Sequence, residues 1–177
     1  MYQSMNRMTG FSLVELLVAV LIFAIGLVGL AALQLVGMRS NQTAYHRSIA
    51  TQLAYDMADR MRSNQAGVIG GGYNQGPSGT DASKCEQVTP SVIPSCTPAE
   101  LAAYDLKRWN DELAARLPGG KGIVCLTKKA PETGDSSDQS ADCDSTGKVY
   151  VVKVWWDDDR SGKTTQGFVT SFQFGGE

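Results

Sequence analysis

Histidine is nearly absent from this sequence, and none of its four cysteines lies in a C-x-x-C pair. The single histidine, His46, is far along the chain from every cysteine, so the ligand spacing of a zinc site is missing. The glycine-rich stretch Gly67–Ser83 lacks the Gly-Lys-Ser/Thr ending of a phosphate-binding loop. No combination of nucleophile, base and orienting residue is recognisable. The sequence therefore argues against an enzyme and predicts neither a metal ion nor a cofactor.

Excess charge of either sign is also missing. Lysine and arginine total 16, aspartate and glutamate total 18, and the formal net charge is -2. Without a basic patch the sequence gives no reason to expect a nucleic-acid partner. A length of 177 residues allows one globular domain and an anchor. The domain left after the anchor is small enough that crosslinks would help to stabilise it.

The N-terminal region contains one long stretch without charge. Between Leu16 and Met38 the only side chain with strong hydrogen-bonding demands is Gln34. About 20 apolar residues are enough to span a bilayer as a helix, so this stretch is a transmembrane candidate. Glu15 lies at its beginning, although a carboxylate at bilayer depth costs about 2.5–3.5 kcal/mol. That cost indicates a function or a partner for Glu15.

The residues Gly10-Phe11-Ser12-Leu13-Val14-Glu15 resemble the class III signal of type IV pilins and pseudopilins. The resemblance implies that a prepilin peptidase cuts between Gly10 and Phe11 and that Phe11 becomes the N-methylated terminus. Glu15 matches the glutamate that the family keeps at the fifth mature position. An ordinary secretory signal is the alternative, but its apolar core has only about 7–15 residues and its cleavage site follows that core. Here the apolar stretch is longer, and the well-placed glycine precedes it.

Glu15 is the residue with the most informative chemistry. We expect its carboxylate to pair with the positive N-terminal amine of Phe11 in an adjoining subunit, which would neutralise both charges in an apolar filament core. The alternative is that Glu15 lies at the membrane interface at little cost. That alternative leaves the spacing between Gly10 and Glu15 unexplained.

Helical periodicity continues beyond the membrane stretch. One apolar stripe at helical spacing predicts a single helix from about Ser12 to about Asn64; its members are Ala50, Leu53, Ala54, Met57, Ala58 and Met61. No proline interrupts the chain from Phe11 to Gly76. The expected organisation is a cleaved leader at 1–10, a pilin helix at 11–64 with 11–38 in the membrane, and a periplasmic head domain at 65–177.

The head domain is predicted to contain one short helix and an antiparallel sheet. Gly67–Ser83 is expected to be a loop, and Thr97-Pro98-Ala99-Glu100 is typical of a helix start. Strands are expected at Gly122–Thr127, at Lys148–Trp156 and from Phe168 onwards. The fold class is therefore α+β and pilin-like, with a long N-terminal helix packed against a small antiparallel sheet.

The four cysteines, Cys85, Cys96, Cys125 and Cys143, all follow the anchor. An even number in an exported segment predicts two disulfides. Of the three ways of pairing four cysteines, we favour the nearest neighbours, Cys85 with Cys96 and Cys125 with Cys143. Each would close a short loop and stabilise the domain by about 2–4 kcal/mol.

Three further features have competing interpretations. Asp157-Asp158-Asp159 could bind calcium but lacks the spacing of a known calcium loop, so a solvated hairpin turn is favoured. Trp155 and Trp156 should point to opposite faces of their strand, one into the core and the other toward a neighbour. His46 is interpreted as a surface residue or a subunit contact.

Within the pilin family the chain is similar to minor pilins of the PilV type, also called type IV pilus modification proteins. The similarity lies in Phe11–Leu33, Ala54–Arg62 and Val151–Asp157. It implies priming of pilus assembly, a possible part in adhesion, and location in the bacterial inner membrane and the pilus. The implied partners are prepilin peptidase, the major pilin, other minor pilins, the inner-membrane assembly platform and membrane lipid. The alternatives are a minor pseudopilin of a type II secretion system and a membrane-tethered periplasmic binding domain.

Overall fold

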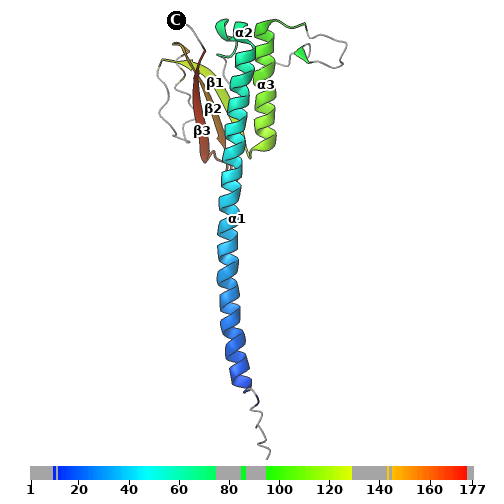
Figure 1. The fold of residues 1–177 in the computed structure, drawn as a ribbon, viewed down its shortest axis with the longest axis vertical. Coiled ribbons are helices and arrows are strands. Elements are labelled where there is room, and N and C mark those ends of the chain that lie inside the picture. The colour runs from blue at the N-terminus through cyan, green and yellow to red at the C-terminus, as the bar shows by residue number, and fades with distance from the viewer. Residues whose placement is uncertain are drawn as a thin grey trace, which may run out of the picture. The chain divides into compact units, whose positions relative to one another are not determined.

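The computed structural model describes residues 10, 12–74, 85–86, 95–128, 143 and 145–174. The elements follow in the order α1 (Leu13–Ser63), α2 (Gln65–Ile69), α3 (Pro98–Arg116), β1 (Lys121–Thr127), β2 (Val149–Trp156) and β3 (Gln166–Gln173) (Figure 1). The chain forms two compact units, Met1–Gln42 and Thr43–Glu177. This is an α+β fold with a long N-terminal helix and a three-stranded antiparallel sheet, as the sequence predicts.

The long helix predicted from Ser12 to Asn64 is α1, and its two halves differ in burial. Every α1 residue up to Gln42 is exposed, whereas the second unit buries one stripe of the helix. The buried residues include the whole predicted apolar stripe; they are His46, Ile49, Ala50, Leu53, Ala54, Met57, Ala58 and Met61. Because these residues recur every three or four positions, they lie on one face of the helix.

The helix α2 corrects the prediction of a loop at Gly67–Ser83 for residues 67–69, while residues 70–74 are not helical and residues 75–83 lie outside the described part of the chain. Asn64 is its N-cap, and its side-chain oxygen accepts a hydrogen bond from the backbone N–H of Gly67. The Asn64 Nδ2 group donates to the carbonyl oxygen of Pro98 at 2.8 Å. A Cβ at position 67 would overlap both the Asn64 side chain and that carbonyl, so glycine permits the close approach. The sequence did not predict this helix because Gly67 and the run of glycines directly after the helix are typical of a loop.

The prediction of a second helix beginning after Thr97 is confirmed by α3. The Thr97 side chain accepts from the Glu100 N–H, while the Glu100 carboxylate accepts from the Thr97 N–H, so a complete capping box is present. At the other end the chain turns through Pro118 and Gly119 into β1.

The sheet has the order β1-β2-β3, and both pairings are antiparallel. Val152 of β2 lies opposite Val124 of β1 and Thr170 of β3, which defines the register. The central strand β2 is buried from Tyr150 to Trp156. The prediction that one tryptophan faces a neighbour is therefore wrong, since Trp155 is 5% exposed and Trp156 is 1% exposed. A central strand can be covered on both faces, and strand alternation alone does not reveal this.

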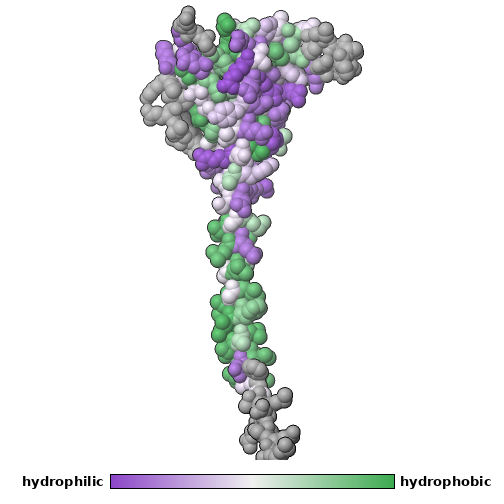
Figure 2. Space-filling model, in the orientation of Figure 1, coloured by the Kyte–Doolittle hydropathy of each residue, from purple (hydrophilic) through white to green (hydrophobic). Residues whose placement is uncertain are grey.

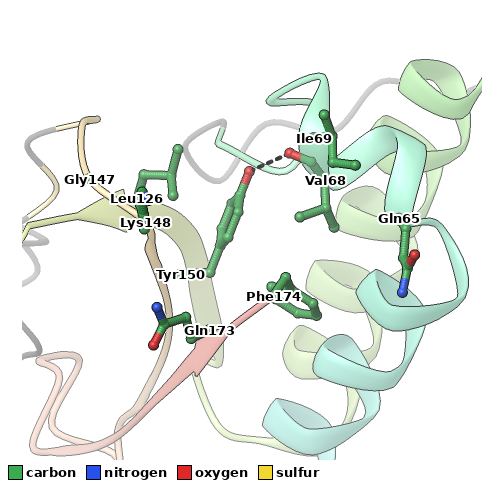
Figure 3. Close-up of a pocket in the computed structure, with 9 residues that line it drawn as sticks. All are labelled: Gln65, Val68, Ile69, Leu126, Gly147, Lys148, Tyr150, Gln173 and Phe174. Atoms are coloured by element: carbon green, nitrogen blue, oxygen red, sulfur yellow. Dashed lines mark hydrogen bonds between the residues drawn. The ribbon is translucent and has the colours of Figure 1, made fainter. Parts of the chain in front are cut away.

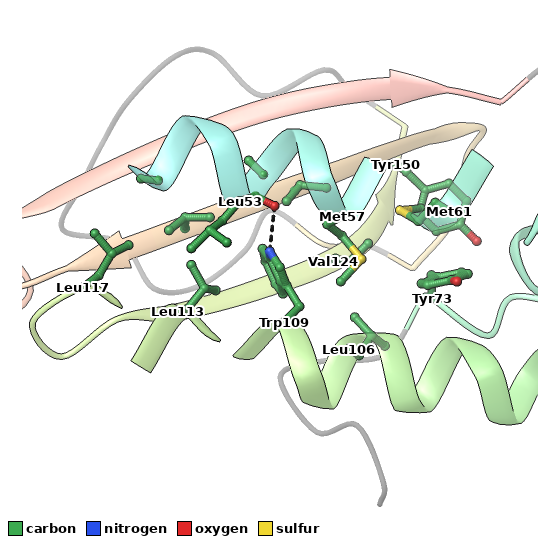
Figure 4. Packing of buried hydrophobic residues seen from close by; sticks show 14 of the residues in the cluster. Leu53, Met57, Met61, Tyr73, Leu106, Trp109, Leu113, Leu117, Val124 and Tyr150 are labelled. Carbon is green, nitrogen blue, oxygen red and sulfur yellow. Dashed lines mark hydrogen bonds between the residues drawn. The ribbon is translucent and has the colours of Figure 1, made fainter. Parts of the chain in front are cut away.

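The core of the second unit lies among α1, α3 and the sheet (Figure 4). Trp109 of α3 is fully buried, and its Nε1–H donates to the Leu53 carbonyl of α1 at 2.8 Å. Gly122 of β1 packs against the Trp109 ring so closely that a Cβ there would overlap it. The indole therefore fills the space between two helices and the sheet, with its polar atom satisfied.

Both disulfides have the nearest-neighbour pairing. Cys85 is bonded to Cys96 with a Cα–Cα distance of 5.2 Å, and Cys125 is bonded to Cys143 with a Cα–Cα distance of 5.6 Å. Both distances lie within the usual range for a disulfide. The first bond joins a segment just before the α3 cap, and the second is attached to β1.

Candidate functional site

The predicted processing residues lie at the beginning of α1. Gly10 is exposed, and no atom lies within 4 Å of the position that a Cβ would take there. Phe11 lies outside the described residues. The carbonyl of Ser12 accepts from the Leu16 N–H at 3.2 Å, which begins the helical hydrogen bonding. Gly10 therefore precedes the helix and is exposed.

Glu15 lies in the first turn of α1 and is exposed. A negative charge in the first helical turn interacts favourably with the helix dipole. Among the described residues, none forms an ion pair with Glu15. Its predicted pairing with the amine of another subunit is not tested by a single chain and remains a proposal.

The first half of α1 presents apolar side chains on all sides. Its large hydrophobic residues from Leu13 to Met38 are 49–74% exposed. An 18-residue window of α1 has a mean hydropathy of 3.0 with none of it buried, so by length and composition the helix could cross a membrane. Figure 2 shows these side chains covering the N-terminal half of the helix. Isolated soluble proteins rarely expose an apolar surface of this extent, so a membrane or other helices must cover it.

In the second unit a polar cluster joins α1 to the turn after β2. The Asp158 carboxylate accepts hydrogen bonds from Thr43 Oγ1 at 2.6 Å and from Trp156 Nε1 at 3.3 Å, and it lies 2.8 Å from His46 Nδ1. Because an ionised carboxylate only accepts, His46 Nδ1 carries the proton in this contact. Burial by itself would raise the pKa of Asp158, but the hydrogen bonds from Thr43, His46 and Trp156 outweigh it and lower that pKa.

This cluster corrects two predictions. His46 is 6% exposed, so it is not a surface residue. The turn predicted at Asp157-Asp158-Asp159 is present and exposed from Asp159 onwards, but the Asp158 side chain faces the cluster instead of solvent. Asp157 accepts from the N–H groups of Ser161 and Gly162 and thereby shapes the turn. Within the described part of the chain, no group of three or more His, Cys, Asp or Glu residues could hold a metal ion. The sequence signal was weak, because Thr43 and His46 are a single helical turn apart but far along the chain from Asp158.

A second cluster joins α1, α3 and the segment after α2. Tyr73 is fully buried, its hydroxyl donates to Asp105 Oδ2 at 2.6 Å, and Asn64 Nδ2 donates to that hydroxyl at 3.2 Å. Arg60 Nη1 lies 3.8 Å from Asp105 Oδ1. Burial raises the pKa of Asp105, and the Tyr73 hydrogen bond and the Arg60 charge oppose that rise. Burial also raises the pKa of Tyr73, so its hydroxyl keeps the proton that it donates.

Comparison with protein families gives two adjoining matches. Residues 5–31 match the prokaryotic N-terminal methylation motif, and residues 32–107 match the family of type IV pilin Tt1218. The chain is a type IV pilin-like protein. Neither the comparison with curated proteins nor that with solved structures gives a match.

The family explains why this pilin exposes so many apolar side chains. The methylation motif covers Gly10, Glu15 and α1 as far as Ala31, so it overlaps the apolar part of the helix that could cross a membrane. The pilin is anchored in the inner membrane through this helix and is a component of the pilus. Processing by prepilin peptidase and assembly with other pilins follow from the same two matches. The pilin family is a family of structural proteins.

Proposed function

We propose that this chain is a minor pilin of the PilV type, which helps to prime pilus assembly and contributes to adhesion. The observation behind this proposal is the resemblance of Phe11–Leu33, Ala54–Arg62 and Val151–Asp157 to such subunits. The Ala54–Arg62 segment belongs to the part of α1 that lies in the second unit. Arg60 within it contacts the carboxylates of Asp56 and Glu112. Arg60 therefore links α1 to α3, as expected of a subunit whose N-terminal helix is attached to its head domain.

The processing steps belong to the same proposal. Prepilin peptidase removes residues 1–10 by cutting between Gly10 and Phe11, and Phe11 becomes N-methylated. Residues 11–64 then form the mature helix, with 11–38 in the membrane, and 65–177 form the periplasmic head. Support comes from the match of the methylation motif and from the exposed position of Gly10 before the helix. The Glu15 carboxylate pairs with the Phe11 amine of an adjoining subunit.

The test is a deletion of this gene in the source organism, combined with immunoblots of sheared pili. A minor pilin should be found in wild-type pili at a small fraction of the major pilin. Its deletion should lower the number of pili while the major pilin is still processed and held in the membrane. Presence only in complexes of a type II secretion system would favour the pseudopilin alternative. Presence only in the membrane, with normal piliation after deletion, would favour the tethered binding domain.

A further inference from the structure

The two edges of the sheet differ in their hydrogen bonding. On β1, the backbone N–H of Gly122 donates to Asn110 Oδ1 at 3.1 Å, and that of Leu126 donates to Asn74 Oδ1 at 2.9 Å. Two asparagine side chains thus satisfy outward donors of β1. The edge of β1 is closed to a further strand, because that strand would have to displace both amides.

The register then identifies which groups of β3 point outward. In an antiparallel sheet, each residue directs its backbone N–H and C=O toward the same neighbouring strand, and consecutive residues alternate between the two sides of their strand. Since Gly122 and Leu126 face away from β2, their partners Val154 and Tyr150 face β3. The residues of β3 that turn away from β2 are consequently Gly167, Val169, Ser171 and Gln173. Within the described part of the chain, these four form no hydrogen bond on their outer side.

Aromatic side chains lie along this open edge. Phe168, Phe172 and Phe174 pack against the core but are only partly buried. Tyr55 of α1 is 49% exposed, and its ring centre is 5.9 Å from that of Phe172 in an edge-to-face arrangement. The Arg62 guanidinium also lies over the Phe172 ring, with its Cζ 5.4 Å from the ring centre. One more strand would cover these rings with every second side chain.

A cavity of about 510 Å³ lies at the C-terminal end of this edge (Figure 3). Its apolar lining includes Val68, Ile69, Tyr150 and Phe174, and Lys148 adds a positive charge. Ile69 is 87% exposed, which is unusual for an isoleucine beside a core. A strand paired with β3 would reach the cavity at Gln173, where an apolar side chain of that strand could be buried.

We propose that the outer edge of β3 pairs with an extended strand from a different pilin subunit. This proposal depends on the proposed function as a pilus subunit. It identifies the outer edge of β3 as the surface of the head domain that subunit assembly uses. Unpaired backbone donors and acceptors at every second residue recognise an extended strand, whatever its sequence. The half-buried aromatic rings and the cavity select apolar residues at alternate positions of the incoming strand.

Antiparallel pairing with β3 of a second copy of this chain is disfavoured by the direction of α1. Two contacts show the relative direction of α1 and β3. His46 of α1 contacts Asp158 in the turn before β3, and Tyr55, farther along α1, contacts Phe172 near the end of β3. The head part of α1 thus runs in the same direction as β3. Antiparallel pairing of two β3 edges, the more stable kind, would set the head parts of the two α1 helices in opposite directions. Subunits that enter one filament from one membrane are expected to share a direction, so a different pilin is the proposed occupant.

The test uses the full chain in cells that assemble pili. A photo-crosslinking residue, p-benzoylphenylalanine, replaces Ser171 on the edge or Lys107 on the exposed face of α3, and crosslinked partners are identified by mass spectrometry. We expect position 171 to crosslink to a different pilin and position 107 to give much less of that product. Equal yields at the two positions, or a product containing β3 of a second copy, would overturn the proposal.

A set of substitutions at Ser171 provides an independent readout. Ser171→Pro removes an outward N–H without breaking a bond to β2, and Ser171→Lys places a charge on the edge. Both should lower incorporation into sheared pili, roughly three- to tenfold for the loss of one hydrogen bond in the ladder. Ser171→Ala keeps the N–H and should incorporate normally. If the wild type enters pili and both edge variants enter equally well, the edge proposal is wrong; if the wild type is absent from pili, the proposed function itself is wrong.

Discussion

Asp158 and His46 are 112 positions apart in the sequence, yet their Oδ1 and Nδ1 atoms lie 2.8 Å apart. His46 is near the point where α1 enters the second unit, and Asp158 begins the turn between β2 and β3. With Thr43 as a further donor to the same carboxylate, the contact attaches the turn after β2 to α1 near the N-terminal boundary of the second unit. We expect this attachment to hold the head on its helix during assembly.

Replacing Asp158 with asparagine tests the attachment. The folded pKa of Asp158 is lower than its ordinary value of 3.8, so its ionised form stabilises the fold above that pH. This contribution should disappear as the pH falls through the lowered pKa. We expect Asp158→Asn to reduce the free energy of unfolding by about 1–3 kcal/mol at neutral pH. The difference from wild type should shrink in acid.

The measurement is chemical denaturation of the full chain in detergent micelles, from neutral pH to below pH 3.8. Asp111→Asn is the matched control, because Asp111 forms only an exposed pair with Lys107 one helical turn away. Exposed pairs of this kind contribute little. Equal stability of Asp158→Asn and wild type at neutral pH would exclude a stabilising role for the cluster.

Tyr73→Phe tests the second cluster. Removing the hydroxyl leaves the Asp105 carboxylate buried with one donor fewer, which should cost about 1–3 kcal/mol when Asp105 is ionised. Because the lost hydrogen bond lowered the pKa of Asp105, the variant should raise that pKa further, and its deficit should be smaller where Asp105 is protonated. Titration of Asp105 by NMR and denaturation at several pH values would measure both effects. Tyr45→Phe, at an exposed position of α1, is the control. An unchanged titration of Asp105 in Tyr73→Phe would contradict the assignment.

Elements governed by local pattern were predictable from this sequence. The stripe from Ala50 to Met61, the capping box at Thr97 and the alternation around Val152 each depend on neighbours a few positions away. The contacts of Asp158 with His46, and of Asn64 with Pro98, depend on how distant elements pack, and no periodicity encodes them. The same reason explains the error over Trp155, since burial of the second sheet face depends on packing that strand alternation does not specify.

Gly122→Ala probes the packing of α3 on β1. The added methyl group would overlap the Trp109 ring, and the indole is held in place by its hydrogen bond to Leu53. Overpacking of this kind costs about 1–3 kcal/mol. Gly37→Ala is the control, since nothing lies within 4 Å of a Cβ there. A thermal melt of both variants should show destabilisation only for Gly122→Ala, and a normal melt for that variant would contradict the packing described for Trp109.

Gly10→Trp tests the cleavage site. A bulky side chain at the residue before the cut should leave the full-length precursor in the inner membrane, while wild type loses residues 1–10. Mass spectrometry of the purified wild-type protein should find N-methylated Phe11 as its first residue. Gly26→Leu, farther along α1 and also in open space, should be processed normally. An uncut and unmodified wild-type N-terminus would refute the assignment of Gly10 and Phe11.

Glu15 separates processing from assembly, because the peptidase acts on a single chain whereas the proposed carboxylate–amine pair requires two. Glu15→Ala removes a charge from an apolar setting, so membrane insertion should become easier. It should also leave the Phe11 amine of an adjoining subunit unpaired in the filament, which is costly at low dielectric. We therefore expect normal cleavage but several-fold less of the protein in sheared pili, and the same for Glu15→Gln, which keeps the shape and loses the charge. Gln34→Ala, which removes the polar side chain within the apolar stretch, is the control and should enter pili normally. Cleavage is measured by gel shift and incorporation by immunoblot in a strain without the wild-type copy; normal incorporation of Glu15→Ala would show that this subunit assembles without the amine pairing.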